Sequence, residues 1–214
     1  DRQQVRARHG RPGTALGQGA EELMEQKTIK THVLQPPERT YPEPLISRLL
    51  FASRASVPVW TIVRLYLGYL WLSSGIPKLS NPAWVGPEAG AAVRGFLANA
   101  LELSIAGTSV PALYAWLIEN IFIPNAFLMS HMVAFGEVLI GIALITGFLT
   151  GISAFLGGLM NASFLLAGTV SSNPVMFILA TWIVLAWRVA GYWGLDYWVL
   201  PLLGAPRNDE AVRR

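Results

Sequence analysis

Four apolar runs, each about as long as a membrane-crossing helix, dominate this sequence. They cover residues 57–77, 127–149, 151–170 and 174–193. A helix needs roughly 20 apolar residues to cross about 30 Å of hydrocarbon. Only 14% of the residues are charged, against about 25% in an ordinary soluble protein. We therefore predict an all-α membrane protein whose core is a four-helix transmembrane bundle.

The connections between the runs predict how the helices are joined. One residue separates the second run from the third, and three separate the third from the fourth, so neighbouring helices must form antiparallel hairpins. The long connection after the first run contains two candidate short helices, one opening near Pro87 and one over residues 111–123. Both are too short to span a membrane, and we expect interfacial helices in a long outer loop that cover the bundle.

The charge distribution divides the chain into three parts. Residues 1–56 contain nine of the sixteen Lys and Arg residues together with several prolines, and such a composition does not build a core. We predict a cytoplasmic, basic, Pro-rich and partly disordered tail over 1–56, the membrane domain over 57–200, and a short cytoplasmic tail over 201–214. The tail over 1–56 either binds across the surface of a partner protein or is a disordered cytoplasmic segment without a partner.

Basic residues near the ends of the runs predict the orientation. The flanks of the first and fourth runs carry Arg39, Arg48, Arg54, Arg207, Arg213 and Arg214, whereas the long loop has only Lys78 and Arg94. Cytoplasmic loops carry the excess of Lys and Arg. We therefore expect a multi-pass protein with both termini in the cytoplasm and the long loop outside.

Several classes of site are excluded by residue type. The chain has no cysteine, which removes disulfides, thiolate metal sites, iron–sulfur clusters and cysteine nucleophiles. The three histidines have no metal-ligand spacing, so neither a metal nor a haem is evident. The sequence contains no dedicated basic domain of the kind that binds nucleic acid, so we do not expect a nucleic-acid partner.

Three polar residues fall near the middles of the first three runs: Arg64, Glu137 and Asn161. A lone charge at the centre of an inserting helix costs roughly 2.5–3.5 kcal/mol, so we expect Arg64 and Glu137 to be neighbours. One interpretation is a structural ion pair, hydrogen-bonded by Asn161, that fixes helix register. The other is a polar pocket in which Arg64 hydrogen-bonds an anion or a quinone carbonyl while Glu137 carries protons.

Other polar residues lie towards the ends of the runs. His131 is either an interfacial hydrogen-bonding residue or a ligand or proton relay. Lys78 directly follows the first run, where a lysine commonly snorkels to the interface. Arg188 and Asp196 flank the end of the fourth run, and we expect them to pair with each other or with lipid head groups.

The order of these features resembles the DoxX/DoxD family. The resemblance covers roughly residues 57–200. Its motifs are Arg64 with Gly68, Ser74-Gly75-Ile76-Pro77-Lys78-Leu79, Gly136-Glu137 with Gly141 and Gly147, Gly158 with Met160, Asn173-Pro174, and Gly194-Leu195-Asp196.

The resemblance implies a four-helix membrane fold in a bacterial or archaeal cytoplasmic membrane. The DoxD branch is similar to the membrane subunit of thiosulfate:quinone oxidoreductase, which passes electrons from thiosulfate to a membrane quinone. In that case Lys78 and Arg94 would hold the small sulfur oxyanion, and a quinone would enter from the lipid bilayer towards Arg64 and Glu137, with Asn161 and His131 as further cofactor-binding candidates.

Two functions therefore remain open from the sequence. The first is a membrane subunit of a quinone-linked oxidoreductase that oxidises thiosulfate or a related sulfur compound. The second is a non-catalytic structural or assembly subunit of a larger respiratory or photosynthetic membrane complex. Both imply other membrane-protein subunits as partners. A small-solute transporter is disfavoured because the sequence has no internal inverted repeat.

Overall fold

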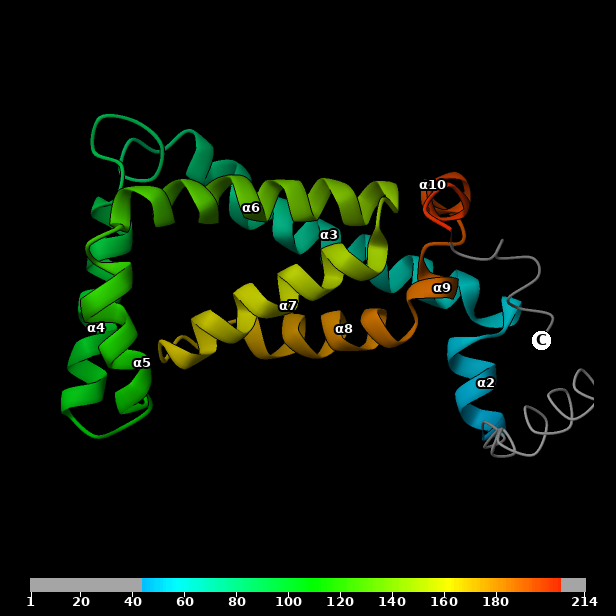
Figure 1. The fold of residues 1–214 in the computed structure, drawn as a ribbon, viewed down its shortest axis with the longest axis horizontal. Helices are drawn as coiled ribbons and strands as arrows, with labels where there is room; N and C mark the ends of the chain where they lie inside the picture. The colour runs from blue at the N-terminus through cyan, green and yellow to red at the C-terminus, as the bar shows by residue number, and fades with distance from the viewer. Residues whose placement is uncertain (1–43, 205–214) are drawn as a thin grey trace, which may run out of the picture. The chain divides into compact units, whose positions relative to one another are not determined.

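A computed structural model describes residues 44–204, and these residues form helices joined by turns, with no strand among them (Figure 1). The all-helical prediction is therefore confirmed for this part of the chain. The helices are α2 (Leu45–Phe51), η1 (Arg54–Ser56), α3 (Val57–Leu79), α4 (Ala91–Ile105), α5 (Ala112–Leu117), η2 (Ile118–Phe122), α6 (Ala126–Thr146), α7 (Thr150–Leu166), α8 (Asn173–Leu185), α9 (Trp187–Ala190) and α10 (Asp196–Leu202).

The four longest apolar helices pack against one another. α3 packs most extensively on α6 and α7 on α8, and α6–α7 and α3–α8 contacts join the two pairs. Between α6 and α7 the chain reverses over residues 147–149, where Gly147 has a φ of +69°. Such a left-handed conformation costs glycine little, because glycine lacks a Cβ atom. The predicted hairpins between consecutive apolar runs are therefore present.

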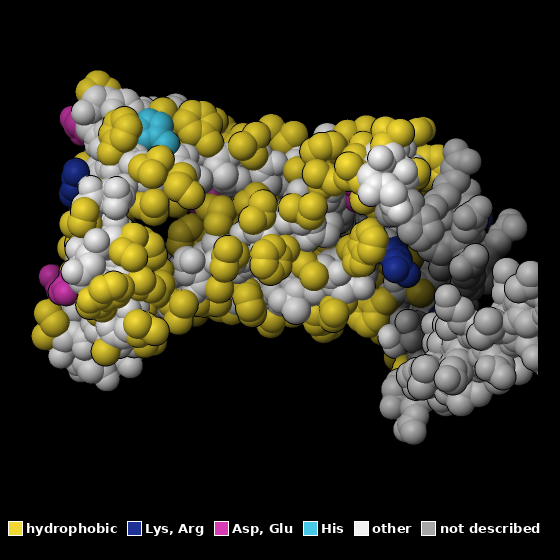
Figure 2. All heavy atoms as spheres, in the orientation of Figure 1, with side chains coloured by type: hydrophobic (Ala, Val, Ile, Leu, Met, Phe, Trp, Pro, Cys, Tyr) yellow, Lys and Arg dark blue, Asp and Glu magenta, His cyan; other side chains and the backbone are white. Residues whose placement is uncertain are grey.

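Two of these helices are long and apolar enough to cross a membrane by length and composition alone: the continuous helix Arg54–Leu79 and α6. α7 has 17 residues and α8 has 13, so spanning by all four remains a prediction. Large apolar side chains on all four helices are exposed, such as Ile62, Leu139, Leu159 and Trp182. In Figure 2 hydrophobic side chains cover the length of α6, α7 and α8, and the Lys and Arg side chains visible on this surface lie at its ends.

The predicted interfacial helices lie across one end of the four-helix bundle (Figure 1). α4, α5 and η2 enclose a second apolar cluster that includes Leu97, Tyr114 and Ile118. α4 begins at Ala91 rather than at Pro87, because a turn with Gly90 at a φ of +97° precedes it. This layer covers the bundle end, as expected.

The opposite end carries α2, α9 and α10. α2 belongs to the predicted tail of residues 1–56, yet it is helical and tied to the bundle, since Trp60 Nε1 donates to the Leu50 carbonyl at 2.6 Å. The folded region therefore begins before residue 57. The predictions for residues 1–43 and 205–214 lie outside the described residues.

Candidate functional site

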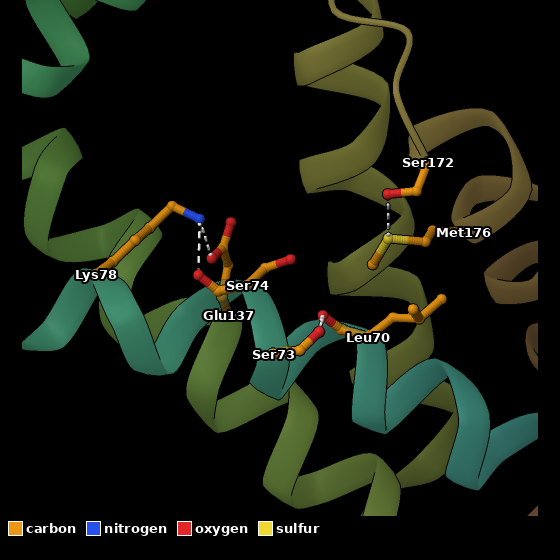
Figure 3. Close-up of polar contacts among 7 residues, drawn as sticks. All are labelled: Leu70, Ser73, Ser74, Lys78, Glu137, Ser172 and Met176. Atoms are coloured by element: carbon orange, nitrogen blue, oxygen red, sulfur yellow. Dashed lines mark hydrogen bonds and ion pairs between the residues drawn. The ribbon is translucent and has the colours of Figure 1, made fainter.

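An ion pair between α3 and α6 forms the centre of the candidate site. Lys78 Nζ lies 2.6 Å from Glu137 Oε2, and the two side chains are 21% and 3% exposed. The same ammonium donates to the carbonyl of Ser74 at 3.0 Å. Figure 3 shows Lys78 extending along α3 to meet Glu137 and Ser74. Because the site is largely buried, removing either charge would leave the other unpaired, which lowers the stability of the fold.

The aromatic ring of Trp84 adds a third contact to this ammonium. Lys78 Nζ lies 5.2 Å from the Trp84 ring centroid, within the range of a cation–π interaction. The carbonyl of Trp84 accepts a hydrogen bond from Ser130 at 2.6 Å, which ties the turn after α3 to α6. The position of Lys78 is therefore defined by a carboxylate, a carbonyl and an indole face.

Lys78 and Glu137 line a cavity of about 440 Å³. This is within the range of roughly 300–1,000 Å³ that holds small ligands. The cavity lies where α6 and α7 meet the α4–α5 layer, and Figure 2 shows a hollow on this face of the bundle. Much of its wall is aromatic or thioether: Trp84, Phe96, Tyr114, Phe122, Phe164, Met129, Met132 and Met160.

Tyr114 anchors the α4–α5 layer to the wall of this cavity. Its hydroxyl donates to the carbonyl of Ser163 on α7 at 2.8 Å. Burial raises the pKa of Tyr114, so the phenol keeps the proton that this hydrogen bond needs. The contact holds the covering layer against the bundle and keeps the cavity walled on that side.

Close packing of α3 on α6 brings the ion pair together. A Cβ atom added to Gly75 would lie 2.9 Å from the Cβ of Glu137 and 2.8 Å from Val138. Both distances are shorter than real Cβ contacts. Gly75 lies one turn before Lys78, so its missing side chain lets Glu137 approach α3 beside the lysine.

Gly75→Ala is expected to cost about 1–3 kcal/mol of unfolding free energy, the usual cost of overpacking. The added methyl group must push α6 away from α3 and so loosen the Lys78–Glu137 contact. Denaturant unfolding in detergent measures the loss. Gly136→Ala is the matched control, since its Cβ would meet only the flexible end of the Met160 side chain, at 3.4 Å from the sulfur and 3.7 Å from the terminal methyl. Equal midpoints for the two variants would contradict this account.

The expected pairing of Arg64 with Glu137 is wrong. Arg64 is 1% exposed, and its guanidinium donates to the carbonyls of Leu144 at 2.9 Å and Trp193 at 3.0 Å. A longer bond of 3.4 Å reaches Ile145. Leu144 and Ile145 belong to the last turn of α6, whose carbonyls have no partner within the helix. Arg64 therefore caps α6 and does not line the cavity.

Asp196 occupies the same end of the bundle as Arg64. Its Oδ2 accepts from the amide of Thr150 at 2.9 Å, at the start of α7, where a carboxylate is favoured. Burial raises the pKa of Asp196, and its bonds to Thr150 and the nearby Arg64 charge act in the opposite direction. Arg188 does not pair with Asp196 among the described residues, and its guanidinium lies 5.3 Å from the Trp187 ring centroid. The alternative, pairing with lipid head groups, stays a prediction.

Three other sequence candidates lie outside the cavity lining. Asn161 is fully buried, and among the described residues neither atom of its amide has a hydrogen-bond partner, so it does not bridge Arg64 and Glu137. His131 Nδ1 lies 2.8 Å from the Phe127 carbonyl, between the rings of Phe127 and Phe135. Arg94 is exposed on α4. The cofactor- and substrate-binding roles predicted for these residues stay predictions.

Sequence reasoning missed the partner of Glu137 and the covering wall of the cavity. Lys78 was identified, but as a cation for an external anion. The signal that could have paired it with Glu137 is Gly75, a small residue one turn away that permits close helix contact. The contributions of Trp84 and Tyr114 depend on how the long loop folds back, which no local pattern reveals.

The site residues lie within a recognised family region. A family model described as "TQO small subunit DoxD", where TQO denotes thiosulfate:quinone oxidoreductase, matches residues 60–212. No curated protein and no solved structure shows significant similarity to the chain. The matched region is more than half of the sequence and contains both Lys78 and Glu137. Together with the long apolar helices, this match identifies the chain as a membrane protein of the DoxD family.

Proposed function

We propose that this chain is the quinone-binding membrane subunit of a thiosulfate:quinone oxidoreductase-like complex. The observation that carries the proposal is the Lys78–Glu137 ion pair in the wall of a cavity of about 440 Å³. Burying an ion pair costs desolvation free energy that the attraction between its charges need not repay, so the pair is weak evidence for a purely stabilising role. Ionisable residues at membrane depth are functional candidates by default.

The charge of the cavity favours a neutral ligand. Lys78 and Glu137 are the charged members of its lining, and their charges cancel. A dianion such as thiosulfate would enter a partly apolar space with no net compensation, which is unfavourable. A quinone is neutral, and its ring suits aromatic and thioether walls. We therefore assign the quinone to this cavity and the sulfur oxyanion to another subunit, not to Lys78 and Arg94.

The two charged residues supply what a quinone head needs. A bound quinone would be the electron acceptor, and its reduction to the quinol takes two electrons and two protons. Lys78 has three N–H donors, of which Glu137 and Ser74 engage two, so the third can bind a carbonyl oxygen. Among the described residues no hydrogen bond reaches Glu137 Oε1, and this oxygen can hold or release a proton beside the ligand.

The membrane topology belongs to the same proposal. α7 measures about 25 Å, and the segment from the start of α8 to the end of α9 about 27 Å, near the roughly 30 Å of hydrocarbon. Arg48, Arg54 and Arg188 lie at the α2 and α9 end, which favours a cytoplasmic location for it. The cavity then lies towards the outer leaflet, where quinone can enter from lipid.

A second candidate function is a structural or assembly subunit without chemistry. The contacts of Arg64 favour it, because all of its hydrogen bonds are to backbone carbonyls that join α3, α6 and the segment before α10. In that case the Lys78–Glu137 pair would serve only to hold α3 against α6. Quinone binding separates the two functions.

Quinone binding can be measured by fluorescence, because Trp84 lines the cavity. Decylubiquinone added to the protein in lipid nanodiscs is expected to quench tryptophan emission saturably. Trp84→Phe should remove most of this component, whereas Trp198→Phe, a change at an exposed position on α10, should not. Excess thiosulfate should leave the titration unchanged. Absence of saturable quenching would refute the quinone proposal, and competition by thiosulfate would refute the assignment of a neutral ligand.

A further inference from the structure

The cavity has a second polar end, opposite the ion pair. The turn between α7 and α8 contributes Thr169, Ser171, Ser172 and Asn173 to its lining. Figure 3 shows Ser172 on the far side of the view from Lys78 and Glu137. Aromatic and methionine side chains make up most of the lining between these ends. The cavity thus offers hydrogen bonds at two separated places and apolar contact between them.

Ser172 is one donor at this second end that a ligand can engage. Its hydroxyl donates to the Met176 sulfur at 3.7 Å, and a thioether is a weak acceptor. The neighbouring Asn173 amide is already committed to the Thr169 carbonyl at 3.2 Å. Ser172 also makes no side-chain capping bond to α8. An oxygen acceptor in the cavity can therefore accept a hydrogen bond from the Ser172 hydroxyl at little cost to the stability of the fold.

The arrangement selects for a ligand with acceptors at opposite ends of a flat apolar body. A ligand with one polar end would leave either the third N–H of Lys78 or the Ser172 hydroxyl without a ligand oxygen, and an unmatched polar contact lowers affinity. A para-quinone has two carbonyl oxygens on opposite sides of its ring, and this matches a cavity with donors at both ends.

We infer that Ser172 binds the second carbonyl of a para-quinone whose first carbonyl faces Lys78. This inference rests on the proposed quinone function and adds the residue that fixes the orientation of the ring. Ser172 acts by donating its hydroxyl proton in a hydrogen bond, without proton transfer. Lys78 and Ser172 then hold the ring at both ends, with Glu137 beside the Lys78 end.

Infrared spectroscopy of bound decylubiquinone tests this orientation, since a hydrogen bond lowers the stretching frequency of the carbonyl that accepts it. The wild-type protein should lower the frequencies of both carbonyls. Ser172→Ala should return one carbonyl to its free frequency and weaken binding about five- to tenfold, the typical value of one hydrogen bond. Ser172→Thr, which keeps the hydroxyl, should retain both lowered frequencies.

Ser73→Ala is the matched control, because Ser73 precedes cavity-lining Ser74 but bonds the Leu70 carbonyl outside the lining. It should change neither frequency nor affinity. Saturable quinone binding with identical spectra for wild type and Ser172→Ala would overturn the role of Ser172 and leave the proposed function standing. Absence of quinone binding by the wild-type protein would overturn both.

Discussion

Replacing Glu137 by Gln is expected to lower the turnover of quinone reduction by about 100-fold or more while leaving the protein folded. Proton transfer by a positioned side chain contributes about 10²–10⁴ to a rate, and an amide cannot exchange the proton. Glutamine has nearly the same size as glutamate, and its carbonyl can still accept from Lys78. The change therefore removes proton transfer while preserving most of the packing.

The measurement is thiosulfate-driven quinone reduction by the whole complex in membranes, with decylubiquinone binding recorded in parallel. Glu119→Gln is the matched control, because Glu119 is exposed on η2 and lies outside the cavity lining. It should retain full turnover. Full turnover of Glu137→Gln would exclude a proton-transferring role. Loss of assembly without any folded complex would instead identify the pair as structural and favour the accessory function.

The helices were predictable because membrane-length apolar runs leave few alternatives. Residues 57–77 and 127–149 correspond closely to α3 and α6. The prediction of one continuous helix over the fourth run, residues 174–193, was less accurate, because α8 ends at Leu185 and α9 follows after Ala186. Hydropathy identifies an apolar segment but does not register a break in its hydrogen bonding.

The partners of the buried charges were not predictable, because they depend on helix register. Aligning the centres of the first two runs puts Arg64 and Glu137 at one depth. In the structure Gly68 packs against Ile145, and Gly75 packs against Glu137. This register carries Arg64 past the end of α6 and brings Lys78 to Glu137. The relative depth of two residues on different helices can be predicted only when the axial offset between those helices is known.

The two charged sites therefore divide their roles along the bundle. Lys78 and Glu137 lie at the end covered by α4 and α5 and contact a cavity. Arg64 and Asp196 lie at the other end, where both side chains hydrogen-bond to the protein backbone and each feels the charge of the other. Changes at the first pair should affect ligand binding and turnover, and changes at the second should affect stability.

Arg64→Leu is expected to destabilise the protein by about 2–5 kcal/mol, because each buried acceptor left without its donor costs about 1–3 kcal/mol. The change leaves the carbonyls of Leu144 and Trp193 without their donor, and Asp196 without a nearby cation. Arg64→Lys should lose less, because a single ammonium can still reach part of this set. Denaturant titration in detergent, followed by circular dichroism, measures the change in unfolding free energy.

The double variant Arg64→Leu with Asp196→Asn separates the effect of charge from that of capping. Burial already raises the pKa of Asp196, so the environment disfavours its charged form and Asp196→Asn alone should cost less than Arg64→Leu. Once Arg64 is gone, neutralising Asp196 removes an unpaired buried carboxylate, and the double variant should be more stable than Arg64→Leu. A double variant as unstable as the sum of the single losses would show that Arg64 acts through the α6 carbonyls alone. Because neither residue lines the cavity, the folded fraction of each variant should bind decylubiquinone with wild-type affinity.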